Sequence, residues 1–300
     1  MKTFQNKKAL ITGAAQGIGQ ATALEFARRG AHLALLDRKI DKLAETRERI
    51  VELGGSCLTL ECDLAVPGQI ESACHQVISQ WGGLDVLVNN AGISHHGPTH
   101  ELTPEERDRI LQVNLVAPFA LFQHLVHHLM NAEAGHLVNI SSIFGLVPHQ
   151  QTAAYSVSKY GLVGLSESLR AEYGRWGLGV TTVCPGFVQT PMIENLPDRS
   201  GNGQKLRKPA RWLMTTPEKV ARKIAVGVLK NRRLILATPL AHFLYHSKRL
   251  APGLFDRVQN FKSSHLTGWM RRSRKPAATS RDSTKSADSK KATCYECEPS

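Results

Sequence analysis

A chain of 300 residues with 42% hydrophobic residues can bury one sizeable core, which predicts one α/β domain with an appendage. The charge is uneven, because residues 1–199 carry 16 Lys and Arg against 19 Asp and Glu, whereas residues 200–300 carry 22 against 6. This asymmetry makes nucleic acid an unlikely partner of the folded part, and six scattered cysteines argue against a disulfide framework and favour a reducing, cytoplasmic compartment.

Taken in chain order, short apolar runs alternate with longer segments of helical periodicity, the pattern of a parallel sheet covered on both faces. The predicted strands are Ala9–Ile11, His32–Leu36, Ser56–Cys62, Leu84–Val88, His136–Ile140, Val180–Val183 and Leu234–Ala237. The predicted helices are Ile18–Arg28, Asp41–Leu53, Ile70–Gln80, Pro104–Met130, Ala153–Trp176 and Pro217–Lys230, the last with Thr216 as its N-cap. The predicted fold is a single Rossmann-type, doubly wound α/β domain with a seven-stranded parallel sheet and a basic C-terminal extension.

The remaining segments break this alternation. Residues 187–212 hold Pro and Gly among polar and basic residues, which predicts a mobile lid. We divide the chain into a catalytic domain (1–240), an amphipathic segment (241–270) and a disordered basic tail (271–300). The amphipathic segment suits either the surface of an anionic membrane or a cover over the pocket, and both readings stay open. We expect no signal peptide and no membrane-spanning helix.

The end of the first strand carries a glycine-rich turn that leads directly into a helix. Gly13, Gln16, Gly17, Ile18 and Gly19 form this turn, and such glycines let the backbone approach a pyrophosphate at the positive end of the helix. Asp37 closes the second strand, where a carboxylate accepts hydrogen bonds from ribose hydroxyls and repels a 2′-phosphate. The cofactor is therefore expected to be NAD, although Arg38 could pair with that phosphate and keeps NADP open.

Tyr155 and Lys159 are four residues apart on one predicted helix, so their side chains share a face. A free tyrosine is a weak base at neutral pH, and a neighbouring ammonium is expected to lower its pKa toward the working range. Ser141-Ser142 ends the preceding strand, so a serine hydroxyl can lie at the edge of the sheet where α/β folds bind ligands.

Together these motifs resemble those of the short-chain dehydrogenase/reductase family. The motifs run in order as Thr12-Gly-x-x-x-Gly-Ile-Gly19, Asp63-Leu64, Asn89-Asn90-Ala91-Gly92, Asn114, Ser142, Tyr155-x-x-x-Lys159, and Pro185-Gly186 followed by Thr190, over roughly residues 4–240. The resemblance implies that Tyr155 transfers a proton, Ser142 holds the substrate oxygen, Lys159 binds the nicotinamide ribose, and Asn114 anchors a water in a proton relay. It also implies cofactor contacts by Asp63, Leu64, Asn90, Ala91, Gly92, Pro185, Gly186, Val188 and Thr190.

Other notable residues receive no functional role. His124, His127 and His128 have a spacing that could bind a metal, but no carboxylate or cysteine nearby completes a site, so we expect no metal. The family resemblance implies instead that this helix packs against a partner subunit. His95 and His96 are expected at the substrate entrance or as exposed loop residues. Cys294 and Cys297 form a single pair near the chain end, at most half a zinc site.

The sequence therefore predicts an oxidoreductase that transfers a hydride between NAD and a lipophilic primary or secondary alcohol. The C-terminal part loosely resembles family members acting on retinoids, steroids or other lipophilic alcohols. An NADP-dependent carbonyl reductase is the alternative enzyme. A non-catalytic, cofactor-sensing scaffold with a lipid- or nucleic-acid-binding tail is the alternative of another class. The resemblance also implies a homodimer or homotetramer.

Overall fold

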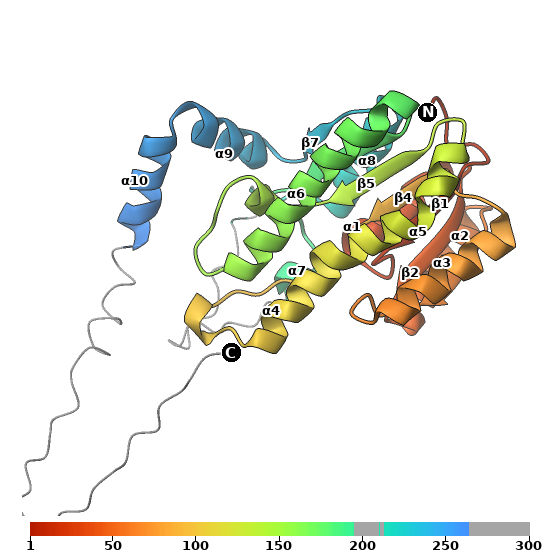
Figure 1. Cartoon of the computed structure of the whole chain (residues 1–300), viewed down its shortest axis with the longest axis horizontal. Coiled ribbons are helices and arrows are strands. Elements are labelled where there is room, and N and C mark those ends of the chain that lie inside the picture. Colours follow the sequence, from red (N-terminus) through yellow and green to blue (C-terminus); the bar gives the residue numbers. More distant parts are fainter. Residues whose placement is uncertain (195–209, 211–212, 264–300) are drawn as a thin grey trace, which may run out of the picture. The chain divides into compact units, whose positions relative to one another are not determined.

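The computed structural model describes residues 1–194, 210 and 213–263 (Figure 1). Its strands form one parallel, seven-stranded sheet in the order β3-β2-β1-β4-β5-β6-β7. Their bounds are β1 Lys8–Thr12, β2 His32–Asp37, β3 Cys57–Glu61, β4 Val86–Asn89, β5 His136–Ile140, β6 Gly179–Cys184 and β7 Leu234–Leu236. The predicted doubly wound sheet is confirmed.

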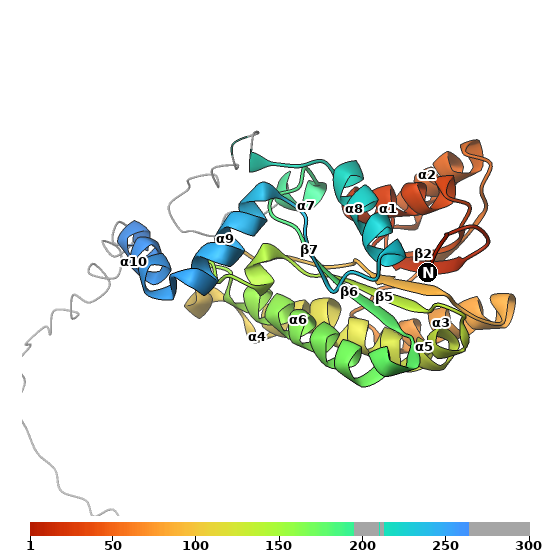
Figure 2. The same ribbon diagram turned by 90° about the horizontal axis from the view of Figure 1, so that it is seen from above.

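Helices cover both faces of this sheet. Figure 2 shows α1, α2 and α8 on one face and α3, α5 and α6 on the other. Their bounds are α1 Gly17–Arg28, α2 Ile40–Glu52, α3 Pro67–Trp81, α4 Pro104–Leu111, α5 Ala117–Asn131, α6 Ala153–Tyr173 and α8 Pro217–Leu229. Because side chains alternate along a strand, Leu10 belongs to the hydrophobic cluster of one face and Ile11 to that of the other. Thr216 caps α8 as predicted, its hydroxyl accepting from Lys219 N.

The chain order places a crevice at one edge of the sheet. From β1 the chain moves outward to β2 and β3, whereas β4 lies on the other side of β1. The loops after β1 and β4 therefore diverge at the carboxyl ends of these strands, where open α/β sheets bind ligands.

The predicted helix 104–130 is interrupted in a way that the periodicity did not predict. It consists of α4, a π-helical turn at Gln112–Val116 and α5. The buried apolar residues Ile110, Val113, Ala117 and Leu121 keep a spacing of three or four residues across this turn, so no break in apolar periodicity marks it. The turn carries Asn114, which is fully buried.

The helical stretch Pro104–Asn131 is long and apolar enough, by length and composition alone, to cross a membrane. Its buried residues Val113, Leu121 and Leu125 belong to the hydrophobic cluster on one face of the sheet. These contacts are those of a core helix, which passes the same test.

The chain divides into two compact units, Met1–Ala251 and Pro252–Ser300. The first unit ends with α9 (Pro239–Leu250), a helix that we did not predict, and the described part of the second is α10 (Pro252–Ser263). Of the predicted lid, the structure describes a bridge between Val188 and Thr215 and the short helix α7 (Pro191–Glu194). The rest of the lid (195–209 and 211–212), the tail 271–300 and Cys294 and Cys297 lie outside the described residues.

Candidate active site

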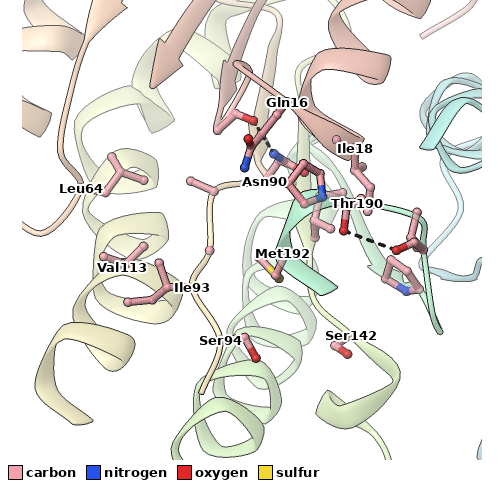
Figure 3. A pocket seen from close by; sticks show the side chains of 18 of the residues that line it. Gln16, Ile18, Leu64, Asn90, Ile93, Ser94, Val113, Ser142, Thr190 and Met192 are labelled. Carbon is pink, nitrogen blue, oxygen red and sulfur yellow. Dashed lines mark hydrogen bonds between the residues drawn. The ribbon is translucent and has the colours of Figure 1, made fainter. Parts of the chain in front are cut away.

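A cavity of about 480 Å³ opens at the carboxyl ends of the strands. Every predicted site residue except Gly19 and Asn114 lines it. Figure 3 shows Gln16, Ile18, Leu64, Asn90, Ser142 and Thr190 around this space. Residues that are distant in the chain therefore meet at the edge where parallel strands are expected to bind a ligand.

The glycine-rich turn forms one end of the cavity. Gly13 and Gly17 have φ angles of +65° and +61°, which residues with a Cβ rarely adopt. Gly19 does not line the cavity, but a Cβ there would lie 2.1 Å from the Gly13 oxygen. The Asn90 side chain supports the turn from behind, because its Nδ2 donates to the carbonyls of Thr12 (2.9 Å) and Gly13 (3.1 Å). The main chain of the turn and the start of α1 thus fit a pyrophosphate.

Two carboxylates lie beside this turn. Asp37 is held at the end of β2, because its two oxygens accept from Ala15 N (3.1 Å) and Lys39 N (3.0 Å). Asp63 accepts from Ala65 N (2.9 Å) and pairs with the Arg109 guanidinium (3.0 Å). Burial acts to raise the pKa of Asp63, but these two partners outweigh it and the pKa is lowered.

Arg109 was not predicted as a site residue. It lies on α4, 46 residues from Asp63, and lines the cavity. Only the tertiary structure brings the two together, so no local motif could have identified it.

Tyr155, Ser142 and Lys159 lie at the other end of the cavity. Ser142 is the side chain that acts to lower the pKa of the Tyr155 hydroxyl. Lys159 Nζ lies 5.8 Å from the centre of the Tyr155 ring and donates to the Ile140 carbonyl (2.9 Å). A phenol, a hydroxyl and an amine therefore share one end of the space that begins at the glycine turn.

The pKa of Tyr155 differs from our expectation. Burial raises it above the ordinary value, and the hydrogen bond with Ser142 opposes that rise only in part. Lys159 does not lower it here, because its amine is directed to Ile140 and burial lowers its own pKa to about 8. Burial therefore decides the direction of the Tyr155 pKa shift.

Asn114 lies behind the cavity wall. Its Oδ1 accepts from Ile93 N (2.8 Å), and its Nδ2 donates to the Ile93 carbonyl (2.9 Å) and to Ser158 Oγ (3.0 Å). Ser158 in turn donates to the Tyr155 carbonyl (2.7 Å). Asn114 thus joins the strand-end loop of Ile93 to the helix that carries Tyr155 and Lys159, and its part in a water relay stays a prediction.

Two serines next to predicted residues were missed. Ser141 donates to the Lys159 carbonyl (2.9 Å) and joins the end of β5 to α6, and Ser158 links α6 to Asn114. Their position next to motif residues was the only sign of a role in the site. The sequence does not indicate which carbonyl a serine hydroxyl reaches.

A nucleotide-binding turn and a Ser-Tyr-Lys group in one cavity of a doubly wound sheet define a nicotinamide-dependent oxidoreductase. The family model described as short chain dehydrogenase matches residues 7–201, and the chain belongs to the short-chain dehydrogenase/reductase family. It is an NAD(P)-dependent dehydrogenase or reductase that acts on CH–OH or carbonyl groups.

Individual relatives support the same class. The dehydrogenase/reductase SDR family member 7B of Bos taurus is 31% identical over 262 residues, which cover 85% of this chain and 80% of that one. A metagenomic short-chain oxidoreductase solved with NADP is 31% identical, with a TM-score of 0.65 over 78% of this chain and 95% of that one. An enzyme of Burkholderia phymatum solved with NAD shares the fold (24% identity, TM-score 0.75, 85% and 96% covered). Relatives thus bind either cofactor.

Proposed function

We propose that this enzyme transfers a hydride between NAD(H) and a lipophilic primary or secondary alcohol or the matching carbonyl compound. The observation that carries the proposal is that Ser142, Tyr155 and Lys159 share one cavity with the glycine turn. In the oxidation, Ser142 holds the substrate oxygen, and Tyr155 takes the hydroxyl proton as the phenolate, after its own proton has left by way of Lys159. Lys159 binds the ribose hydroxyls and passes the proton toward solvent. Asn114 anchors the water that links Lys159 to solvent. Bound NAD supplies the hydride acceptor.

The proposed cofactor site runs the length of the cavity. Main-chain groups of Gly13, Gln16, Gly17 and Ile18 hold the pyrophosphate, with Gly19 shaping the turn. Asp63 and Leu64 contact the adenine, and Asn90, Ala91 and Gly92 form a wall. The remaining proposed contacts, near the carboxamide, are Pro185, Gly186, Val188 and Thr190.

NAD rather than NADP is proposed because the Asp37 carboxylate is fixed in the cavity wall by two main-chain hydrogen bonds. A 2′-phosphate beside it would meet like charge. Arg38 lines the same wall and is the observation that favours the NADP-dependent carbonyl reductase. Comparing kcat/KM for the two cofactors tests this. The wild type should prefer NAD, and Asp37→Ala should remove most of the preference, whereas a wild-type preference for NADP would contradict the assignment.

The reaction itself is tested by incubating the full chain with NAD and a panel of straight-chain, cyclic and sterol alcohols, while following the absorbance of reduced nicotinamide. We expect turnover that rises with the apolar surface of the alcohol. A chain that reduces neither cofactor with any alcohol, and oxidises neither reduced cofactor with any ketone, would contradict the proposal.

We also propose a homodimer or homotetramer in the cytoplasm. Val116, Phe119 and Val157 on or beside α5 and α6 are large, apolar and exposed, as in an interface between subunits. The described cysteines Cys57, Cys62, Cys74 and Cys184 are free thiols, which supports a reducing compartment. Light scattering of the purified chain should give a dimer or larger assembly, and Phe119→Ser should weaken it.

Peripheral contact with an anionic membrane is proposed for the segment 241–270. Phe243 and Leu250 on α9 are 68% and 84% exposed, and Arg249 directly precedes Leu250 in the chain. Sedimentation with anionic vesicles tests this contact. The wild type should bind more than a variant with Phe243→Ser and Leu250→Ser, and equal binding would contradict it. The division at residues 240 and 270 stays a prediction.

A further inference from the structure

The two ends of the cavity differ in charge. The charged lining residues near the glycine turn are Asp37, Arg38, Lys39, Asp63 and Arg109. At the end of Ser142, the only charged side chain among the described lining residues is Lys159, which is buried and bonded to Ile140. Figure 3 places Ser94 and Ser142 at the side of the pocket opposite Gln16.

A row of four aromatic rings borders the uncharged end. His96 and His149 have ring centres 6.4 Å apart, His149 lies 4.6 Å from Phe144, and Phe144 lies 6.3 Å from Phe187. We call these residues the aromatic row. The loops that carry its first two members are tied together, because Gly97 N donates to the Gln151 carbonyl (2.9 Å).

Phe144 and Phe187 are the members that line the cavity. Their planes meet at 81°, so one ring presents its edge to the other's face. Phe144 is two residues from Ser142, and its main-chain amide donates to Ser142 Oγ (3.2 Å), which ties the main chain of Phe144 to the hydroxyl proposed to hold the substrate oxygen. The His149 ring packs on the Phe144 ring.

These surroundings suit one kind of substrate. Aromatic rings in edge-to-face or offset contact gain energy beyond the area they bury, whereas a carboxylate or phosphate here would lose hydration without a free cation in the described wall. Ser142 and Tyr155 provide hydrogen bonds for a single oxygen.

We propose that the substrate is an uncharged alcohol or ketone with an aromatic ring adjacent to the carbinol carbon, and that Phe144 and Phe187 hold this ring. The inference rests on the proposed function and narrows its substrate class. In the oxidation, the carbinol C–H bond breaks with its electron pair passing to NAD, the O–H proton passes to the Tyr155 oxygen whose own proton has left toward solvent by way of Lys159, and the C=O bond forms. NADH and one proton balance the loss of two hydrogens from the alcohol.

A matched pair of substrates tests the inference, namely 1-phenylethanol and 1-cyclohexylethanol, which differ in the aromaticity of one six-membered ring. The wild type should favour the phenyl compound in kcat/KM by about three- to tenfold. Phe144→Leu and Phe187→Leu should each reduce this ratio, whereas Phe4→Leu, at a phenylalanine that packs on Phe26 outside the cavity, should leave it unchanged. The two alcohols also differ in intrinsic reactivity, but this difference is the same for every variant. A change in the kcat/KM ratio between wild type and variant therefore reports the protein's contribution alone. Mandelate, the carboxylated analogue, should be at least about tenfold poorer.

Ketone binding gives a readout without turnover. Calorimetric titration of the wild type and both leucine variants, each with NAD present, should show tighter binding of acetophenone than of cyclohexyl methyl ketone, and a smaller difference in the variants. Equal affinities of the wild type for the two ketones would overturn the inference even if the variants do not fold. A ratio of the two affinities that is unchanged in both folded variants would also overturn it. Selective binding of acetophenone without turnover of any alcohol would instead overturn the proposed reaction and support the aryl site.

Discussion

Strands β5 and β6 carry buried polar side chains toward both of their ends. Toward the amino ends, the Thr181 hydroxyl donates its hydrogen to the Arg232 carbonyl (2.6 Å). In its contact with His136 Nε2 (2.8 Å), the Thr181 oxygen is therefore the acceptor. At the carboxyl ends, Ser141 bonds to the backbone of α6, while Ser142 lines the cavity with Tyr155. At the amino edge, the buried polar side chains hydrogen-bond to protein groups and so stabilise the fold. At the carboxyl edge, some polar side chains face the cavity, where they can hydrogen-bond to a ligand. Substitutions at the two edges should therefore affect different properties.

The largest effect is expected at the cavity. Tyr155→Phe removes only the hydroxyl, so kcat should fall by about a hundred- to ten-thousandfold, the usual contribution of general acid–base catalysis. The dissociation constant for NAD and the melting temperature should change little. Titration calorimetry beside steady-state kinetics measures both, and a parallel loss of NAD binding would assign Tyr155 a structural role.

The glycine turn comes next. Gly19→Ala places a methyl group 2.1 Å from the Gly13 oxygen and 2.4 Å from Asn90 Nδ2, so the turn must move. The dissociation constant for NAD should rise about ten- to a hundredfold, as for an overpacked site costing 1–3 kcal/mol. Gly164→Ala on α6 is the control, because nothing lies within 4 Å of the added group. If both variants bind NAD like the wild type, the turn does not hold the cofactor.

Ser141 should act as a positioning residue with a smaller effect. Ser141→Ala loses the hydrogen bond to the Lys159 carbonyl, worth about 0.5–1.5 kcal/mol, so kcat/KM should fall by up to about tenfold. Water should reach Lys159 more easily, so its pKa should rise from about 8 toward 10.5 and shift the pH profile of kcat/KM upward.

Ser141→Thr, which keeps the hydroxyl, should restore much of the loss, and Ser168→Ala on the exposed side of α6 should change nothing. A lower melting temperature with an unshifted pH profile would show that Ser141 only stabilises the fold.

The amino edge should affect stability alone. Burial, with smaller contributions from the amino terminus and Arg170, lowers the pKa of His136 from 6.5 to about 3. Between pH 6.5 and about pH 3, His136 therefore binds a proton in the unfolded chain but not in the folded chain. The free energy of unfolding should decrease as pH falls from about 6.5 to about 3, by at most about 1.4 kcal/mol per pH unit from this group.

Urea denaturation across that pH range measures the slope. It should be shallower in His136→Gln than in the wild type, and unchanged in His32→Gln, where the histidine is exposed. Parallel slopes in all three proteins would remove His136 as the cause. NAD binding by folded His136→Gln should match the wild type, because the residue lies away from the cavity lining.

The sheet could be predicted because its strands are apolar on both faces and are bounded by Gly, Pro or polar residues. Each predicted strand lies within two residues of the observed one, as Ser56–Cys62 and Cys57–Glu61 illustrate. Helix α9 was missed, because an apolar run followed by cations fits a membrane-interface segment as well as a surface helix. The π turn at Asn114 was missed because one inserted residue leaves the apolar stripe almost unchanged.

The candidate site shows the same limit. Residues that act together through their spacing in the sequence, such as those of the glycine turn, could be predicted from motifs. The partners of Asp63, Lys159 and Phe144 depend on which side chains meet in space, and Arg109, Ser141 and Phe187 carry no local signal for this. The raised pKa of Tyr155 likewise follows from burial, which spacing does not reveal.

The central claim is that the nicotinamide and a carbinol carbon meet in one cavity beside Tyr155. Its most direct test uses NADH deuterated at the transferable position, with the ketone that the wild-type enzyme reduces fastest. Mass spectrometry and NMR of the alcohol should find one deuterium on the carbinol carbon and none released to water. Product that carries only hydrogen at that carbon, or deuterium recovered in the solvent, would contradict the account.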